Sequence, residues 1–166
     1  MCFLSLFVVM VLLMIILSRQ GKPLQTPAAK SGIGSFELAW TKARAQQILA
    51  SWQGLYDVAR VQLTWDFGFL LVYPLVLSLA CGLLAQAAQN RLPEIGSFLS
   101  WSVLAAGCLD AAENLCLLRM LKTEATDLLV RTASTCGSIK FLLIFAGCGY
   151  VLVQGAAIVI AKREGP

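Results

Sequence analysis

Histidine is absent from this chain of 166 residues. Without it, zinc sites with imidazole ligands and a histidine general base are both excluded. The six cysteines include no Cys-x-x-Cys pair, which argues against a thiol–disulfide oxidoreductase of the usual kind and against a four-thiolate zinc site. Phosphate-binding glycine loops and serine nucleophile elbows are also missing from the sequence. We therefore assign no metal and no cofactor.

Charged residues are also scarce in this chain. Only 13% of the residues are charged and 58% are hydrophobic, whereas soluble domains carry about 25% charged and about 45–50% apolar residues. A soluble protein of this size could not bury the excess apolar surface. The composition predicts an all-α integral membrane protein that forms a single domain over residues 1–166. The net charge of +4 is spread along the chain without a nucleic-acid motif, so we expect no nucleic-acid partner.

Four apolar runs predict four membrane-spanning helices. A helix rises 1.5 Å per residue, so about 20 residues cross the hydrocarbon core. The runs cover about 2–18, 65–88, 98–121 and 139–161. A cleaved signal peptide is the competing interpretation of the first run. No basic residue precedes that run and no small-x-small site follows it, so we expect an uncleaved span.

The segments between the spans carry further patterns. Over about 36–62, residues such as Trp40, Ile48 and Trp52 recur at helical spacing, opposite a polar face. This pattern predicts an amphipathic helix that either lies in the membrane interface or packs against the bundle, and we favour an interfacial helix on the cytoplasmic side. Pro74 predicts a bend or local irregularity in the second span. We also expect a turn at 89–94 and a short amphipathic helix within 122–138.

The basic residues are distributed unevenly between the two ends of the predicted bundle. Four spans place the first and third loops on one side, and the termini with the second loop on the other. Ten basic residues belong to the first side: Arg19, Lys22, Lys30, Lys42, Arg44, Arg60, Arg119, Lys122, Arg131 and Lys140. The other side has three: Arg91, Lys162 and Arg163. Basic residues are retained on the cytoplasmic face, so both termini should face away from the cytoplasm.

Acidic and amide side chains interrupt the third span. Asp110, Glu113 and Asn114 stand at i, i+3 and i+4, which places them on one helix face. Charged groups in hydrocarbon are costly and suggest a role. Counting from the cytoplasmic ends of the spans predicts a polar cluster in the inner half of the bundle. Its members are Asp66, Tyr73, Asp110, Glu113, Asn114, Arg119 and Lys140.

Such a cluster has four possible roles: helix packing, binding, catalysis or conduction of protons or cations. We favour a small scaffold or accessory protein whose cluster packs the helices or binds membrane lipids or another membrane protein. In that case Asp66, Asn114, Arg119 and Lys140 are the binding candidates. The alternative is a membrane-embedded enzyme acting on a lipid. Glu113 or Asp110 would then be the general acid or base, assisted by Tyr73.

Two resemblances follow from these motifs. The string Asp110-x-x-Glu113-Asn114 is similar to the aspartate-rich motifs that hold magnesium in membrane prenyltransferases. Those enzymes carry two such motifs and this chain has one, so we assign no metal from it. The stretch 43–52, then Asp66-Phe67 with Tyr73, then 107–114, resembles small bacterial polytopic membrane proteins. That resemblance implies a bacterial inner-membrane location and no particular activity.

Overall fold

A computed structural model describes residues 2–87 and 92–164, and every regular element in these ranges is a helix. The elements are α1 (Cys2–Gln20), the short 3-10 helix η1 (Lys22–Leu24), α2 (Ile33–Glu37), α3 (Lys42–Ser51), α4 (Tyr56–Ala87), α5 (Leu92–Lys122) and α6 (Asp127–Glu164). The helices α1, α4, α5 and α6 are each long and apolar enough to cross a membrane. The predicted all-helical class with four such helices is therefore confirmed. The turn predicted at 89–94 is wrong for residues 92–94, which belong to the first turn of α5, and its remaining residues lie outside the described ranges.

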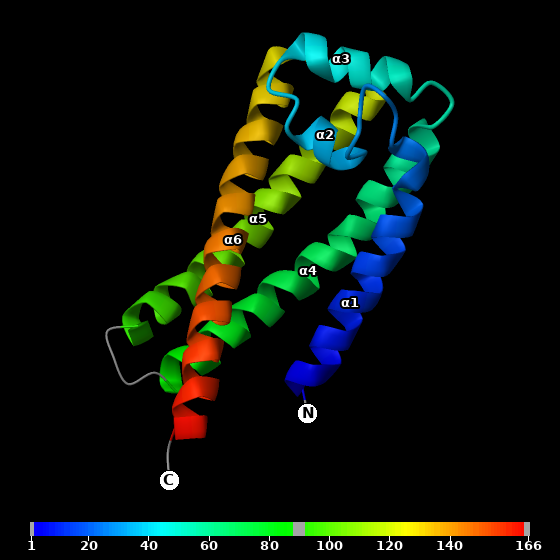
Figure 1. The fold of residues 1–166 in the computed structure, drawn as a ribbon. Helices are drawn as coiled ribbons and strands as arrows, with labels where there is room; N and C mark the ends of the chain where they lie inside the picture. The colour runs from blue at the N-terminus through cyan, green and yellow to red at the C-terminus, as the bar shows by residue number, and fades with distance from the viewer. Residues whose placement is uncertain (1, 88–91, 165–166) are drawn as a thin grey trace.

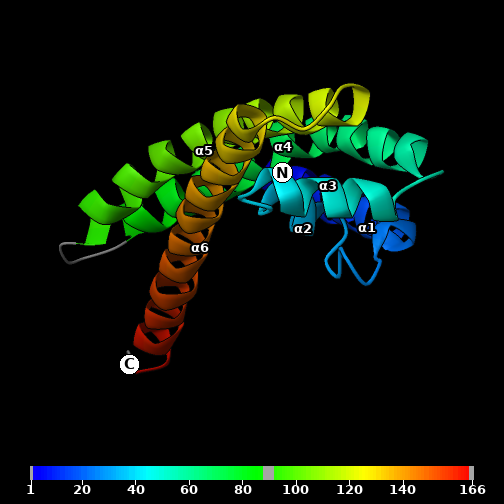
Figure 2. The same ribbon diagram turned by 90° about the horizontal axis from the view of Figure 1, so that it is seen from above.

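The four long helices run up and down, so that their ends gather at two poles (Figure 1). The ends of α1 and α5 meet the beginnings of α4 and α6 at one pole, where α2 and α3 form a cap. Both chain termini lie at the opposite pole. α4 packs against α1 and α5, and α5 packs against α6. Seen from the capped pole, α6 diverges from the other long helices (Figure 2).

The contact between α4 and α5 depends on small residues. A Cβ atom at Gly107 would lie 2.9 Å from Cγ of Pro74 and 3.3 Å from the carbonyl oxygen of Leu70. Glycine therefore permits the close approach of the two helices. A hydrogen bond of 2.9 Å between the hydroxyls of Ser78 and Ser100 also joins α4 to α5. The helix α4 runs through Pro74 as one continuous element.

The single helix predicted over 36–62 does not form. The chain leaves α2 at Glu37, and Trp40 has a φ of 59°, a conformation that ends helical geometry in a residue other than glycine. Gly54, with a φ of 82°, separates α3 from α4, because glycine adopts positive φ without a steric penalty. From Tyr56 onward the predicted amphipathic segment is continuous with the second long helix.

The cap turns its apolar side chains inward. Phe36, Ile48 and Trp52 are buried, and the Trp52 ring meets the Phe36 ring edge-on with 5.4 Å between centroids. The indole nitrogen of Trp52 donates a hydrogen bond of 2.8 Å to the carbonyl of Leu24. Trp40 is half exposed. The cap packs against the long helices, because Ile48 and Trp52 share a buried cluster with Leu117 and Met120 of α5. Its location in the membrane interface stays a prediction.

The last long helix begins earlier than the sequence analysis predicts. The separate short helix expected within 122–138 is wrong, because α6 is continuous from Asp127 onward. The hydroxyl of Thr126 accepts a hydrogen bond of 3.3 Å from the backbone nitrogen of Leu129, which is the usual way to begin a helix. Lys140 therefore lies about 20 Å along α6 from its first residue, inside the helical array.

Candidate functional site

Lys140 is the centre of a buried ion cluster. Its ammonium donates a hydrogen bond of 2.9 Å to Oδ1 of Asp110 and lies 2.8 Å from Oε2 of Glu113. Both carboxylates belong to α5, and all three side chains are at least nine-tenths buried. The ammonium also lies 4.8 Å from the centre of the Phe141 ring, a favourable cation–π distance. The Lys140 ammonium on α6 thus forms ion pairs with two carboxylates on α5.

The same lysine connects the cap to the long helices. Oε2 of Glu37, the last residue of α2, lies 3.8 Å from the Lys140 ammonium. Six residues earlier on α6, the hydroxyl of Ser134 donates a hydrogen bond of 2.8 Å to the carbonyl of Glu37. It also accepts a hydrogen bond of 2.9 Å from the backbone nitrogen of Trp40. The chain that links α2 to α3 is therefore attached to α6 at several points.

A second polar contact joins α4 to α5. The amide nitrogen of Asn114 donates a hydrogen bond of 2.6 Å to Oδ2 of Asp66. Asn114 is fully buried and Tyr73, on α4, is also buried, with its hydroxyl beside Asp110. We refer below to Glu37, Asp66, Asp110, Glu113, Asn114 and Lys140 together as the Lys140 cluster.

Gly137 provides the space that the Glu113 carboxylate occupies. A Cβ atom at residue 137 would lie 2.9 Å from Oε1 of Glu113. Oε1 is buried and makes no hydrogen bond to any described residue. The spacing of three residues between Gly137 and Lys140 places both toward the same side of α6. The carboxylate is thus enclosed between its ion pair and a glycine backbone.

Six of the seven predicted cluster residues are brought together: Asp66, Tyr73, Asp110, Glu113, Asn114 and Lys140. Arg119 is not among them, because its side chain is exposed and makes no ion pair to a described residue. Nine residues separate Arg119 from Asp110, which is two and a half helical turns and therefore the opposite face of α5.

Glu37 is the member of the cluster that sequence reasoning missed. Its burial raises the pKa of the Glu37 carboxyl above the usual value, and the nearby Lys140 ammonium opposes that increase. The signal available in the sequence is an acid placed between Phe36 and Leu38 in an apolar context. Its pairing with Lys140 spans most of the chain, so local spacing could not reveal it.

The charges of the cluster do not balance. Glu37, Asp66, Asp110 and Glu113 supply four carboxyl groups, whereas Lys140 supplies one ammonium. Buried charges are tolerated when they are paired, so the remaining acids need protons or a further cation. Within 2–87 and 92–164, no set of three or more acidic or cysteine side chains is arranged to hold a metal ion.

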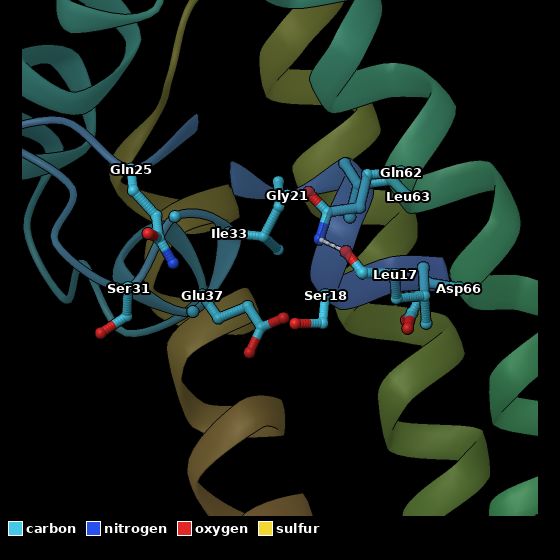
Figure 3. Close-up of a pocket in the computed structure, with 12 residues that line it drawn as sticks. Leu17, Ser18, Gly21, Gln25, Ser31, Ile33, Glu37, Gln62, Leu63 and Asp66 are labelled. Atoms are coloured by element: carbon cyan, nitrogen blue, oxygen red, sulfur yellow. Dashed lines mark hydrogen bonds between the residues drawn. The ribbon is translucent and has the colours of Figure 1, made fainter. Parts of the chain in front are cut away.

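A polar cavity of about 210 Å³ opens beside the cluster (Figure 3). It lies between the end of α1, the Ser31–Gly34 segment, α2 and α4. Glu37 and Asp66 enter its wall from opposite sides, and the Glu37 carboxylate points toward the Ser18 hydroxyl. The cavity therefore gives an unidentified ligand access to two of the four acids.

Comparison with protein-family models, with curated proteins and with solved structures finds no match to this chain.

Proposed function

We propose that this protein is a small membrane-embedded accessory protein whose Lys140 cluster fastens its cytoplasmic end and presents incompletely neutralised acids to a lipid or a partner protein. One observation carries this proposal. A single buried ammonium, on α6, lies within 4 Å of carboxylates from both α2 and α5. Such a shared contact sets the relative register of the three elements, because each carboxylate is satisfied in only one arrangement.

The distribution of exposed apolar side chains supports a membrane location. Large hydrophobic residues are exposed along all four long helices, among them Leu4, Phe98, Leu142 and Leu152, each at least 68% exposed. Soluble monomers rarely expose such continuous apolar surface. In a bilayer these side chains face acyl chains, and burial inside the protein is not needed.

The cluster is placed by this proposal at one boundary of the hydrocarbon. The stretches Phe67–Ala87 of α4 and Phe141–Ala161 of α6 contain no charged residue. Each spans about 30 Å as a helix, which is the thickness of the hydrocarbon core. Asp66 and Lys140 immediately precede these stretches, so they mark the same boundary. The cap then covers this boundary from the aqueous side.

The distribution of basic residues supports a cytoplasmic location for that boundary. Arg19, Lys22, Lys42, Arg44 and Lys122 all belong to the capped pole. Positive charge is retained on the cytoplasmic side of bacterial inner membranes, which is the location that the sequence resemblance implies. Both termini then face away from the cytoplasm. Lys140 itself is buried in the cluster, so it adds nothing to this bias.

The alternative of a lipid-modifying enzyme has less support. A general acid or base must reach its substrate, and Glu113 and Asp110 are both engaged by Lys140. The polar cavity is lined instead by Glu37 and Asp66. The arrangement therefore favours packing and binding over proton transfer by Glu113.

Neutralising the carboxylates on α5 distinguishes the two functions. We expect Asp110→Asn and Glu113→Gln each to lower the free energy of unfolding by about 1–3 kcal/mol, because a charge-assisted contact is lost from a buried site. Thermal unfolding in detergent should show a decrease of several degrees in the melting temperature. Proteins that co-purify with the wild type should be lost to an extent that follows the decrease in melting temperature.

The matched control is Asp57→Asn, which removes an acid from an exposed pair with Arg60 on the surface of α4. Exposed pairs contribute little, so this variant should unfold like the wild type. If both cluster variants keep the wild-type melting temperature and partners but lose turnover of a lipid, the enzyme is correct and the accessory function is wrong.

A further inference from the structure

The polar cavity has acceptor groups on Glu37, Gln62 and Asp66, and its lining also includes Ser18, Gln25 and Ser31, whose side chains can both donate and accept. Glu37 and Asp66 contribute carboxylates, and Oε1 of Gln62 is buried there without a hydrogen-bond partner among the described residues. The amide nitrogen of Gln62 is already used, because it donates a hydrogen bond of 3.3 Å to the carbonyl of Leu17. Figure 3 shows this amide turned toward the end of α1. A ligand that donates hydrogen bonds would satisfy the two carboxylates and the Gln62 oxygen.

When the acids that line the cavity are ionised, the charge that they lack is positive. Lys140 is shared by Glu37, Asp110 and Glu113, whereas Asp66 is held by the neutral amide of Asn114. The side of the cluster that faces the cavity therefore carries excess negative charge when its acids are ionised. A primary ammonium group supplies both the opposite charge and three donors, which suits this wall.

An apolar groove continues from the polar cavity along the outside of α6. This groove has a volume of about 580 Å³, and its lining includes Leu38, Phe141, Leu142 and Phe145. Ser31 and Gly34 line both the groove and the polar cavity, so the two hollows adjoin the same segment. Phe141 and Phe145 are one helical turn apart, which directs the groove along the axis of α6.

We propose that the two hollows together bind one phospholipid with a primary ammonium head group, of the phosphatidylethanolamine class. The ammonium enters the polar cavity between Glu37 and Asp66, and one acyl chain follows the groove on α6. This inference rests on the proposed membrane location and names the lipid that the accessory protein would bind. A choline head has no N–H group to donate, and a phosphatidylglycerol head has no ammonium to offset the charge of its phosphate beside the carboxylates.

Binding of acyl-chain-labelled lipids to the full-length protein in detergent micelles tests this proposal. We expect phosphatidylethanolamine to bind about tenfold more tightly than phosphatidylcholine or phosphatidylglycerol, which is the effect of about one charge-assisted hydrogen bond. Glu37→Gln and Asp66→Asn should each weaken binding of phosphatidylethanolamine about tenfold and remove the preference. Glycerophosphoethanolamine, which has no acyl chains, should compete only weakly.

The groove is tested by a matched pair of variants on α6. Ser138 lines the groove, so Ser138→Trp should block the acyl chain and abolish binding of every labelled lipid. The neighbouring Ile139 is exposed and is not among the groove residues. Ile139→Trp should therefore bind lipid like the wild type. Melting temperatures measured on the same samples report whether each variant is folded.

Equal binding of the three lipids by the wild type would overturn the proposal. So would an unchanged lipid preference in folded Glu37→Gln and Asp66→Asn proteins, and equal binding by Ser138→Trp and Ile139→Trp. These failures leave the accessory function intact, since that function is tested by the stability of the Asp110 and Glu113 variants. Loss of an ethanolamine-independent protein partner in the Glu37 variant would assign the cavity to a cationic side chain of that partner.

Discussion

Lys140→Met should destabilise the protein by about 3–5 kcal/mol, because it leaves carboxylates buried without their common counter-charge. Asp110 and Glu113 are at most 5% exposed, so water cannot replace the ammonium without opening the contact between α5 and α6. Methionine is similar to lysine in length and flexibility, so the loss of packing is small. The expected decrease in melting temperature is on the order of 10 °C.

Thermal unfolding in one detergent measures this effect against two controls. Lys140→Arg retains the charge and should recover part of the stability, although the guanidinium is larger and planar. Lys122→Met removes a cation from an exposed position at the end of α5 and should change the melting temperature little. A Lys140→Met protein that unfolds at the wild-type temperature would show that the carboxylates do not depend on this lysine.

Trp52→Ala should release the cap at a cost of about 3–5 kcal/mol. Trp52 is fully buried, packs edge-on against Phe36 and donates a hydrogen bond to the carbonyl of Leu24. Removing the indole leaves a large void and an unsatisfied buried carbonyl. Limited proteolysis should then cut the segment between α1 and α4 well before the long helices.

The matched control for Trp52→Ala is Trp101→Ala. Trp101 is 76% exposed on α5, so its loss should leave both the melting temperature and the protease pattern close to those of the wild type. Equal protection of the segment in the two alanine variants would mean that Trp52 does not anchor the cap. If Trp52→Ala and Trp101→Ala lower the melting temperature equally, the difference in burial between the two side chains does not determine their contribution to stability.

The long helices were predictable because hydropathy alone identifies them. Each predicted span lies within one of the observed long helices. The exception is residue 88 at the end of the second span, which lies outside the described residues. The ends were less predictable. No proline or glycine interrupts the chain between Asp127 and Cys136, so nothing in that polar segment ends α6, although its polarity suggested a separate helix. The polar residues there do not break the helix.

The core of the cluster was predictable from helix geometry, and its remainder was not. Asp110, Glu113 and Asn114 share one face by spacing alone, and the same periodicity applied further would have excluded Arg119. Glu37 required knowledge of the fold, because the chain turns at Trp40 and brings α2 back against α6. The turn depends on a tertiary contact with Ser134, which no local pattern records.

Lys140 and the acids around it are expected to contribute to stability cooperatively, because they share one set of ion pairs. A double-mutant cycle with Lys140→Met and Glu113→Gln measures this directly through the free energy of unfolding in detergent. Because Glu113→Gln removes one of the charges that Lys140→Met leaves unpaired, we expect the double variant to lose at least about 1 kcal/mol less than the sum of the single losses. Strictly additive losses would contradict the account, since they would mean that the two side chains do not interact.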